Sequence, residues 1–215
     1  MKTLLCYGDS NTHGSLPTAD PAVRKRLPLE QRWPGVVRKR LGDAWFVVEE
    51  GLGGRTTVHD DPIEGAHKNG LSGLPIALES HRPIDLVALM LGTNDLKVRF
   101  SVSAGDIARS NAVLIDFIRR STMTGPGGKA PDVLLIAPPT ILEVGQQIDM
   151  CAGGAAKSQK FGSLFAEVAR TYGLPFLDAS TVVQPSPIDG VHLTPEAHSE
   201  LGNAIANKIM SLQPA

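Results

Sequence analysis

Apolar segments recur along the chain at intervals that fit buried strands. They are rich in aliphatic and β-branched residues, and most are continuous instead of alternating with polar positions, which is typical of strands covered on both faces in a parallel sheet. The segments are residues 2–7, 45–49, 85–91, 132–137 and 175–177. The pattern therefore predicts a sheet of five strands.

Helical periodicity separates the predicted strands. Apolar positions in segments 107–118, 161–172 and 201–212 recur at spacings of three and four residues, so each marks one face of a helix. A further helix is predicted over 33–41. Ser103 is expected to cap the helix that includes 107–118, and Thr194 followed by Pro195 is expected to open the last one.

Strands that alternate with helices imply right-handed crossovers and helices on both faces of the sheet. The sequence thus predicts an α/β fold, a three-layer α/β/α sandwich with a flavodoxin-like parallel sheet in the strand order 2-1-3-4-5. A length of 215 residues favours one domain over residues 1–215. The glycine-rich stretches 125–128 and 153–154 are expected to be surface turns.

Composition excludes several classes of partner. The 21 Lys and Arg residues nearly balance the 22 Asp and Glu residues, so neither nucleic acid nor an anionic membrane surface is expected as a partner. The short basic runs 24–26 and 38–40 are expected to be solvated faces. No stretch has the roughly 20 apolar residues of a membrane span, and the N-terminal apolar stretch is too short for a signal peptide.

Cysteine usage favours a reducing compartment. The chain has two cysteines, which do not make a disulfide framework, and Cys6 lies in the first predicted strand, where a buried thiol behaves as a small hydrophobic group. The expected location is cytoplasmic.

Residues able to perform acyl transfer follow the predicted strands. Ser10 follows the first strand, Gly54 the second, Asn94 the third, and Asp189 and His192 the last. In an open parallel sheet, the loops after the strands meet at one edge and form the ligand crevice. These residues are therefore expected to surround one site.

The same residues suit the demands of a serine hydrolase. Ser10 is the expected nucleophile, with His192 as its base and Asp189 as the group that orients the imidazole. The backbone N–H groups of Ser10 and Gly54 and the side-chain amide of Asn94 are expected to form the oxyanion hole. Taken alone, Ser10 would be interpreted as a helix cap.

Four sequence blocks resemble those of the SGNH hydrolases, also called GDSL esterases and lipases. They are Gly8-Asp9-Ser10, Gly54, Gly92-Thr93-Asn94-Asp95 and Asp189-Gly190-Val191-His192. Residues 51–57, 91–95 and 189–194 further resemble the bacterial arylesterase and acyltransferase branch. This resemblance implies hydrolysis of short-chain aryl or alkyl esters through an acyl-enzyme, with acyl transfer to alcohol or peroxide as a side activity, and a homo-oligomer.

Two positions depart from the family pattern. Position 11 is Asn instead of Leu, and His13 stands where this branch often carries Trp. Asp9, Asn11, His13 and Pro138 are expected to contact the substrate. No cofactor is expected, and no metal, because the remaining histidines lack a recognised ligand spacing.

Two other functions compete with a short-chain esterase. A carbohydrate O-deacetylase would use the same catalytic residues with a different pocket. A non-catalytic binding module would keep the fold and lose turnover, and it is disfavoured because every residue needed for catalysis is present. The expected partner is a small-molecule ester.

Overall fold

A computed structural model describes residues 1–20 and 22–212 of the chain. Within these residues, five parallel strands form one sheet in the order β2-β1-β3-β4-β5, which confirms the predicted strand order. The strands are β1 (Lys2–Gly8), β2 (Trp45–Gly51), β3 (Leu86–Met90), β4 (Asp132–Ala137) and β5 (Phe176–Asp178).

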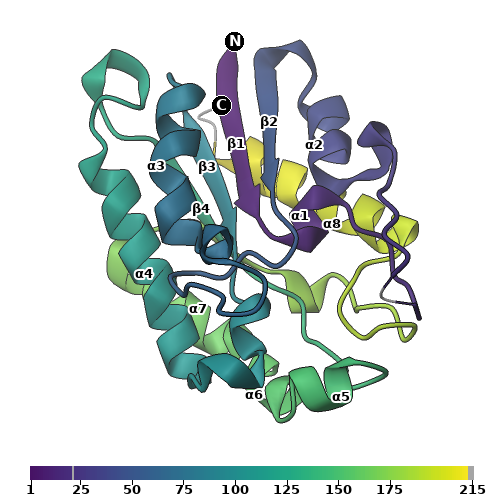
Figure 1. Ribbon diagram of the computed structural model, residues 1–215. Coiled ribbons are helices and arrows are strands. Elements are labelled where there is room, and N and C mark those ends of the chain that lie inside the picture. The colour runs from purple at the N-terminus through teal and green to yellow at the C-terminus, as the bar shows by residue number, and fades with distance from the viewer. Residues whose placement is uncertain (21, 213–215) are drawn as a thin grey trace.

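Helices cover both faces of the sheet, as predicted, so the fold has three layers. Helices α3, α4 and α7 lie on one face, and α2 and α8 lie on the other (Figure 1). The helices are α1 (Ser10–His13), α2 (Trp33–Leu41), α3 (Gly70–Ser80), α4 (Ala104–Arg120), α5 (Gln147–Met150), α6 (Gly154–Ser158), α7 (Phe161–Tyr172) and α8 (Pro195–Ser211). No helix in this described part of the chain is both long and apolar enough to cross a membrane.

The two hydrophobic layers explain why the strands are continuously apolar. Leu5 and Tyr7 of β1 pack toward α3 and α4, while Leu4 and Cys6 pack toward α2 and α8. All four side chains are completely buried. Burial of an aliphatic side chain contributes roughly 1.5–3 kcal/mol, so both faces of each central strand stabilise the sandwich.

Helix α3 was not predicted from the sequence. It contains Gly73 and Pro75, residues that disfavour a helix, so its local propensity is poor. Asn69 caps its first turn by accepting hydrogen bonds from two backbone N–H groups, and Leu74 and Leu78 are fully buried against the sheet. Tertiary packing therefore stabilises this helix. The predicted caps Ser103 and Thr194 are confirmed, since each accepts a hydrogen bond from its own helix.

Helix α1 lies directly on the carboxyl ends of β1 and β2. A Cβ atom on Gly51 would collide with the backbone of Thr12 and His13, so glycine at this position permits the close approach. The glycine thus allows the loop after β1 to turn across the strand ends. This turn determines where Ser10 is presented.

Candidate active site

Ser10 is the first residue of α1, and one residue separates it from the end of β1. Asp9 occupies the N-cap position, and its carboxylate accepts a hydrogen bond of 2.9 Å from the Asn11 N–H. At the other end of this short helix, Gly14 adopts a left-handed conformation and donates its N–H to the Ser10 carbonyl. Ser10 is therefore held in a closed turn at the carboxyl edge of the sheet.

Asp189 and His192 form an ion pair in the loop before α8. The Asp189 Oδ2 atom lies 2.8 Å from His192 Nδ1, and Oδ1 accepts the backbone N–H of His192 at 3.0 Å. Burial alone would raise the pKa of the Asp189 carboxyl, but the hydrogen bonds from His192 outweigh it and lower that pKa to about 2. Asp189 is thus ionised at neutral pH, and Nε2 is the imidazole nitrogen left to accept a proton.

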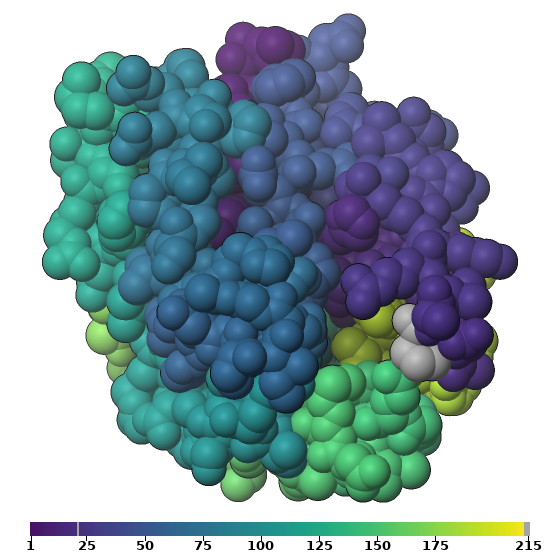
Figure 2. Space-filling view, in the orientation of Figure 1, coloured from purple at the N-terminus to yellow at the C-terminus, as the bar shows by residue number. Residues whose placement is uncertain are grey.

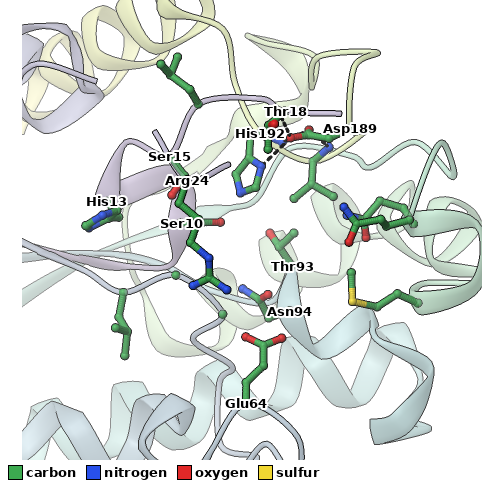
Figure 3. Close-up of a pocket in the computed structure, with 18 of the residues that line it drawn as sticks. Ser10, His13, Ser15, Thr18, Arg24, Glu64, Thr93, Asn94, Asp189 and His192 are labelled. Carbon is green, nitrogen blue, oxygen red and sulfur yellow. Dashed lines mark hydrogen bonds and ion pairs between the residues drawn. The ribbon is translucent and has the colours of Figure 1, made fainter. Parts of the chain in front are cut away.

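Ser10 and His192 line the same cavity. Figure 3 shows the imidazole of His192 and the side chain of Ser10 directed into the same space. Among the described residues, no hydrogen bond joins these two side chains. Hydrogen bonds between a nucleophile and its base are often long in a ligand-free site and shorten when substrate binds.

Three hydrogen-bond donors lie beside Ser10. Gly54 has a φ of 81°, a conformation suited to glycine, in the turn after β2. The Asn94 side-chain amide donates to the Arg55 carbonyl at 3.1 Å, which orients it and leaves its second N–H available. The backbone N–H groups of Ser10 and Gly54 have no hydrogen-bond partner within residues 1–20 and 22–212. All three residues line the same cavity, so these groups are candidates for donating hydrogen bonds to an oxyanion.

Asp95 fixes the loop after β3 to the loop after β2. Its buried carboxylate accepts the Thr57 backbone N–H at 3.1 Å and also the Thr57 hydroxyl. Burial raises the pKa of the Asp95 carboxyl, although the bonds from Thr57 oppose this effect. Asp95 directly follows Asn94 in the sequence. Its bonds to Thr57 therefore hold the loop that carries Asn94 against the loop that carries Gly54.

The cavity has a volume of about 500 Å³ and opens on the face shown in Figure 2. There it is a hollow between the surfaces of residues 15–18 and 23–26, segment 51–68 and segment 146–151. The sequence-predicted residues that line it are Ser10, His13, Gly54, Asn94, Asp189 and His192. The loops after successive strands therefore bring six of the nine candidates to one place.

Asp9, Asn11 and Pro138 do not line the cavity, contrary to the expectation that they contact the substrate. Asn11 is 2% exposed, and both ends of its amide are bonded to the backbone of the His192 loop. Asp9 is 1% exposed, and burial raises its pKa to about 6. Pro138 is buried beside Gly92. These three residues are buried outside the cavity wall.

Thr18 contacts the ion pair and was not identified from the sequence. Its backbone N–H donates to Asp189 Oδ2 at 3.0 Å, the same oxygen that holds His192 Nδ1. The bond links positions 171 residues apart, so no local pattern could have indicated it.

A network of four charged residues borders the cavity and was also missed. Lys97 Nζ lies 2.5 Å from Glu64 Oε1 and 3.6 Å from Asp61 Oδ2. Arg99 contacts the same two carboxylates at 2.7 Å. Lys97 is only 5% exposed. A buried ammonium group is costly unless it is paired, and the two carboxylates provide that pairing. Glu64 and Lys97 reach the cavity wall.

Residues 6–199 match the model of the GDSL-like lipase/acylhydrolase family. Among solved structures, an aryl esterase of M. smegmatis is 36% identical with a TM-score of 0.94, over 99% of this chain and 100% of that one. Est24, a carbohydrate acetylesterase from Sinorhizobium meliloti, is 38% identical with a TM-score of 0.94 over the same shares. No curated protein matches significantly.

Proposed function

The chain belongs to the GDSL-like lipase/acylhydrolase family, and on this premise we propose that it is a serine esterase that hydrolyses short-chain acyl esters. One observation carries the proposal. The Asp189–His192 ion pair lines the same cavity as Ser10 and the donors on Gly54 and Asn94. This combination of nucleophile, oriented base and oxyanion donors is what acyl transfer requires.

In the proposed mechanism, Ser10 Oγ attacks the ester carbonyl while His192 Nε2 takes the hydroxyl proton. Asp189 stabilises the imidazolium through Nδ1. The carbonyl oxygen becomes an oxyanion that accepts hydrogen bonds from Ser10 N, Gly54 N and Asn94 Nδ2. The carbon–oxygen bond to the alcohol then breaks, and the alcohol leaves with the proton from His192.

The second half of the cycle releases the acyl group. Water attacks the ester of Ser10, and His192 takes its proton and returns it to Ser10 Oγ as the carboxylic acid leaves. An alcohol or peroxide in the place of water would give acyl transfer. Measuring an ester product in the presence of added alcohol tests this side activity.

The experiment that tests the proposal is hydrolysis of p-nitrophenyl acetate by the wild-type protein and by Ser10→Ala. The wild type should release p-nitrophenol, and the variant should lose activity by a factor on the order of 10³ or more. Equal activity of the two proteins would contradict the proposal. The same comparison excludes a non-catalytic binding module, which would show no turnover in either.

The second candidate function is deacetylation of carbohydrates. It is favoured by the 38% identity to Est24, a carbohydrate acetylesterase. The catalytic residues would act in the same way, with a sugar hydroxyl as leaving group. Comparing kcat/KM for p-nitrophenyl acetate with that for an acetylated xylose or glucose separates the two.

Assembly and location are further parts of the proposal. We expect a homo-oligomer in the cytoplasm, because of the resemblance to the arylesterase branch and the absence of paired cysteines among the described residues. Light scattering after size-exclusion chromatography measures the assembly state, and a single-chain mass would contradict it. Cell fractionation measures the location.

A further inference from the structure

Basic residues gather on the wall of the cavity. Those that line it are Arg24, Lys25, Arg26, Lys68 and Lys97, whereas the carboxylates that line it, within the described chain, are Glu64 and Asp189. The run 24–26 was expected to be an ordinary solvated face. It is exposed, but it borders the cavity. A cavity with this lining attracts an anion.

Both of the lining carboxylates already hold hydrogen bonds from neighbours, and Glu64 is also neutralised by two cations. Glu64 lies within 2.7 Å of Lys97 and Arg99, and Asp189 is paired with His192. Burial would raise the pKa of Glu64, but its bonds to Lys97 outweigh it and lower that pKa. Glu64 therefore has little remaining capacity to neutralise the other cations of the wall, and both oxygens of Asp189 are occupied by bonds from Thr18, Val191 and His192.

Arg24 and Lys68 are cations of the cavity wall that lack a carboxylate partner among the described residues. Among residues 1–20 and 22–212, no carboxylate oxygen lies within 4 Å of the charged nitrogens of either side chain. Lys68 Nζ donates to the Gly53 carbonyl at 2.7 Å, beside the Gly54 turn. Figure 3 shows the Arg24 side chain extending into the cavity, with its guanidinium group toward Asn94. Both charges thus lie close to the place where an ester would react.

The loop that carries Arg24 is held at its base. Leu16 donates to the Lys25 carbonyl at 3.0 Å, and Leu27 donates to the Gly14 carbonyl at 2.8 Å. Residues 15 and 26 also form an antiparallel bridge. Arg24 lies next to this paired base, so its backbone is anchored. A guanidinium carried on an anchored backbone can bind a carboxylate through two parallel hydrogen bonds.

From this placement we infer that the preferred substrates are esters that carry a carboxylate, which Arg24 binds, with Lys68 adding a second positive charge. The inference rests on the proposed esterase function and adds a substrate class to it. It makes Arg24 a specificity-determining residue. The carboxylate can belong to the acyl part or to the alcohol part of the ester, and the two are distinguished by experiment.

The test compares two matched pairs of esters. In the first, the p-nitrophenyl monoester of succinate is compared with p-nitrophenyl butyrate, which has a methyl group in place of the carboxylate. In the second, 4-acetoxybenzoate is compared with p-tolyl acetate. The quantity measured is the ratio of kcat/KM for the charged ester to that for its neutral partner.

Arg24→Gln should lower this ratio by about tenfold in at least one pair, since an arginine hydrogen-bonded to a carboxylate contributes that much to binding. Arg24→Lys should retain part of the preference, and added salt should weaken it in the wild type. Arg109→Gln is the matched control, because Arg109 is an exposed arginine of α4 that does not line the cavity.

Unchanged ratios in both pairs for Arg24→Gln would overturn the inference. The neutral esters separate this failure from failure of the proposed function. Wild-type hydrolysis of neutral esters that is lost in Ser10→Ala supports the esterase whether or not the ratio depends on Arg24. Failure of the wild type to hydrolyse any of the four esters would overturn both.

Discussion

Asn11 holds His192 in place through the backbone on both sides of the histidine. Its Nδ2 donates to the Val191 carbonyl, and its Oδ1 accepts the Leu193 N–H, both at 3.1 Å. Asn11 follows Ser10 directly on α1, so one short helix carries the candidate nucleophile and also the group that positions its base. The separation between Ser10 and His192 depends on this connection.

Replacing Asn11 with Ala should therefore reduce kcat on p-nitrophenyl acetate more than it changes KM. The substitution leaves the Leu193 N–H without its partner in a buried place, which should lower the free energy of unfolding in urea by about 1–3 kcal/mol. Asn203→Ala is the control, since Asn203 bonds to its own helix on the exposed side of α8. A loss of stability with unchanged kcat would indicate that Asn11 does not position the base.

Asp189→Asn should lower kcat by a factor on the order of 10³ to 10⁴. The amide can still accept the backbone N–H groups of the turn, so the fold should persist, but it cannot stabilise the imidazolium of His192. Circular dichroism checks the fold and steady-state kinetics checks the loss. Asp43→Asn, an exposed position outside the cavity, should keep full activity. Near-wild-type kcat in Asp189→Asn would contradict the assignment.

Gly54→Ala and Gly42→Ala form a matched pair. Both glycines have positive φ, at 81° and 59°, so alanine should cost roughly 1–3 kcal/mol of stability at each. At Gly54 the new Cβ would also collide with Glu64 Oε2, whereas no heavy atom lies within 4 Å of the corresponding Cβ at Gly42. Only Gly54→Ala should lose activity, by about a hundredfold, because the displaced N–H no longer meets the oxyanion. Equal activity of the two variants would contradict this role.

Stability should decrease in acid because several carboxylates have depressed pKa values, and Asp61 and Asp189 are the two lowered to about 2. Asp61 has a pKa of about 2, because bonds to Glu64 N and Arg99 outweigh the effect of burial, and Asp189 has a similar value. An unfolded aspartate titrates near about 3.9, so the unfolded chain binds these protons first as the pH falls. The stabilisation is complete above about pH 4 and is lost toward about pH 2.

Urea unfolding measured through this range checks the acid dependence. Asp61→Asn should show a shallower decline of the unfolding free energy with falling pH than the wild type does, because it lacks one of the carboxyls whose pKa is depressed in the folded state. Identical slopes for the two proteins would contradict the role of Asp61.

The sequence predicted the strand order and the convergence of Ser10, Asn94 and His192 because these depend on local signals. Each residue follows an apolar strand or precedes a capped helix, and parallel strands bring their carboxyl ends together. His198 of α8 is fully buried, with Nδ1 accepting the Trp33 N–H.

The rest depended on contacts that no local pattern contains. Asn11 was expected to contact the substrate, but its amide is bonded to the backbone on both sides of His192, a contact between residues about 180 positions apart in the sequence. Thr18 bonds to Asp189, which is 171 residues away in the sequence, and Lys97 bonds to Glu64, which is 33 residues away. Helix α3 has poor intrinsic propensity, and burial overrides it.

The most direct test of the account is to trap the acyl-enzyme. Mixing the protein with p-nitrophenyl acetate, quenching in acid before turnover is complete and mapping the peptides by mass spectrometry should locate one acetyl group on Ser10, with none in Ser10→Ala. An acetyl group on another residue, or steady hydrolysis by Ser10→Ala without any adduct, would contradict it.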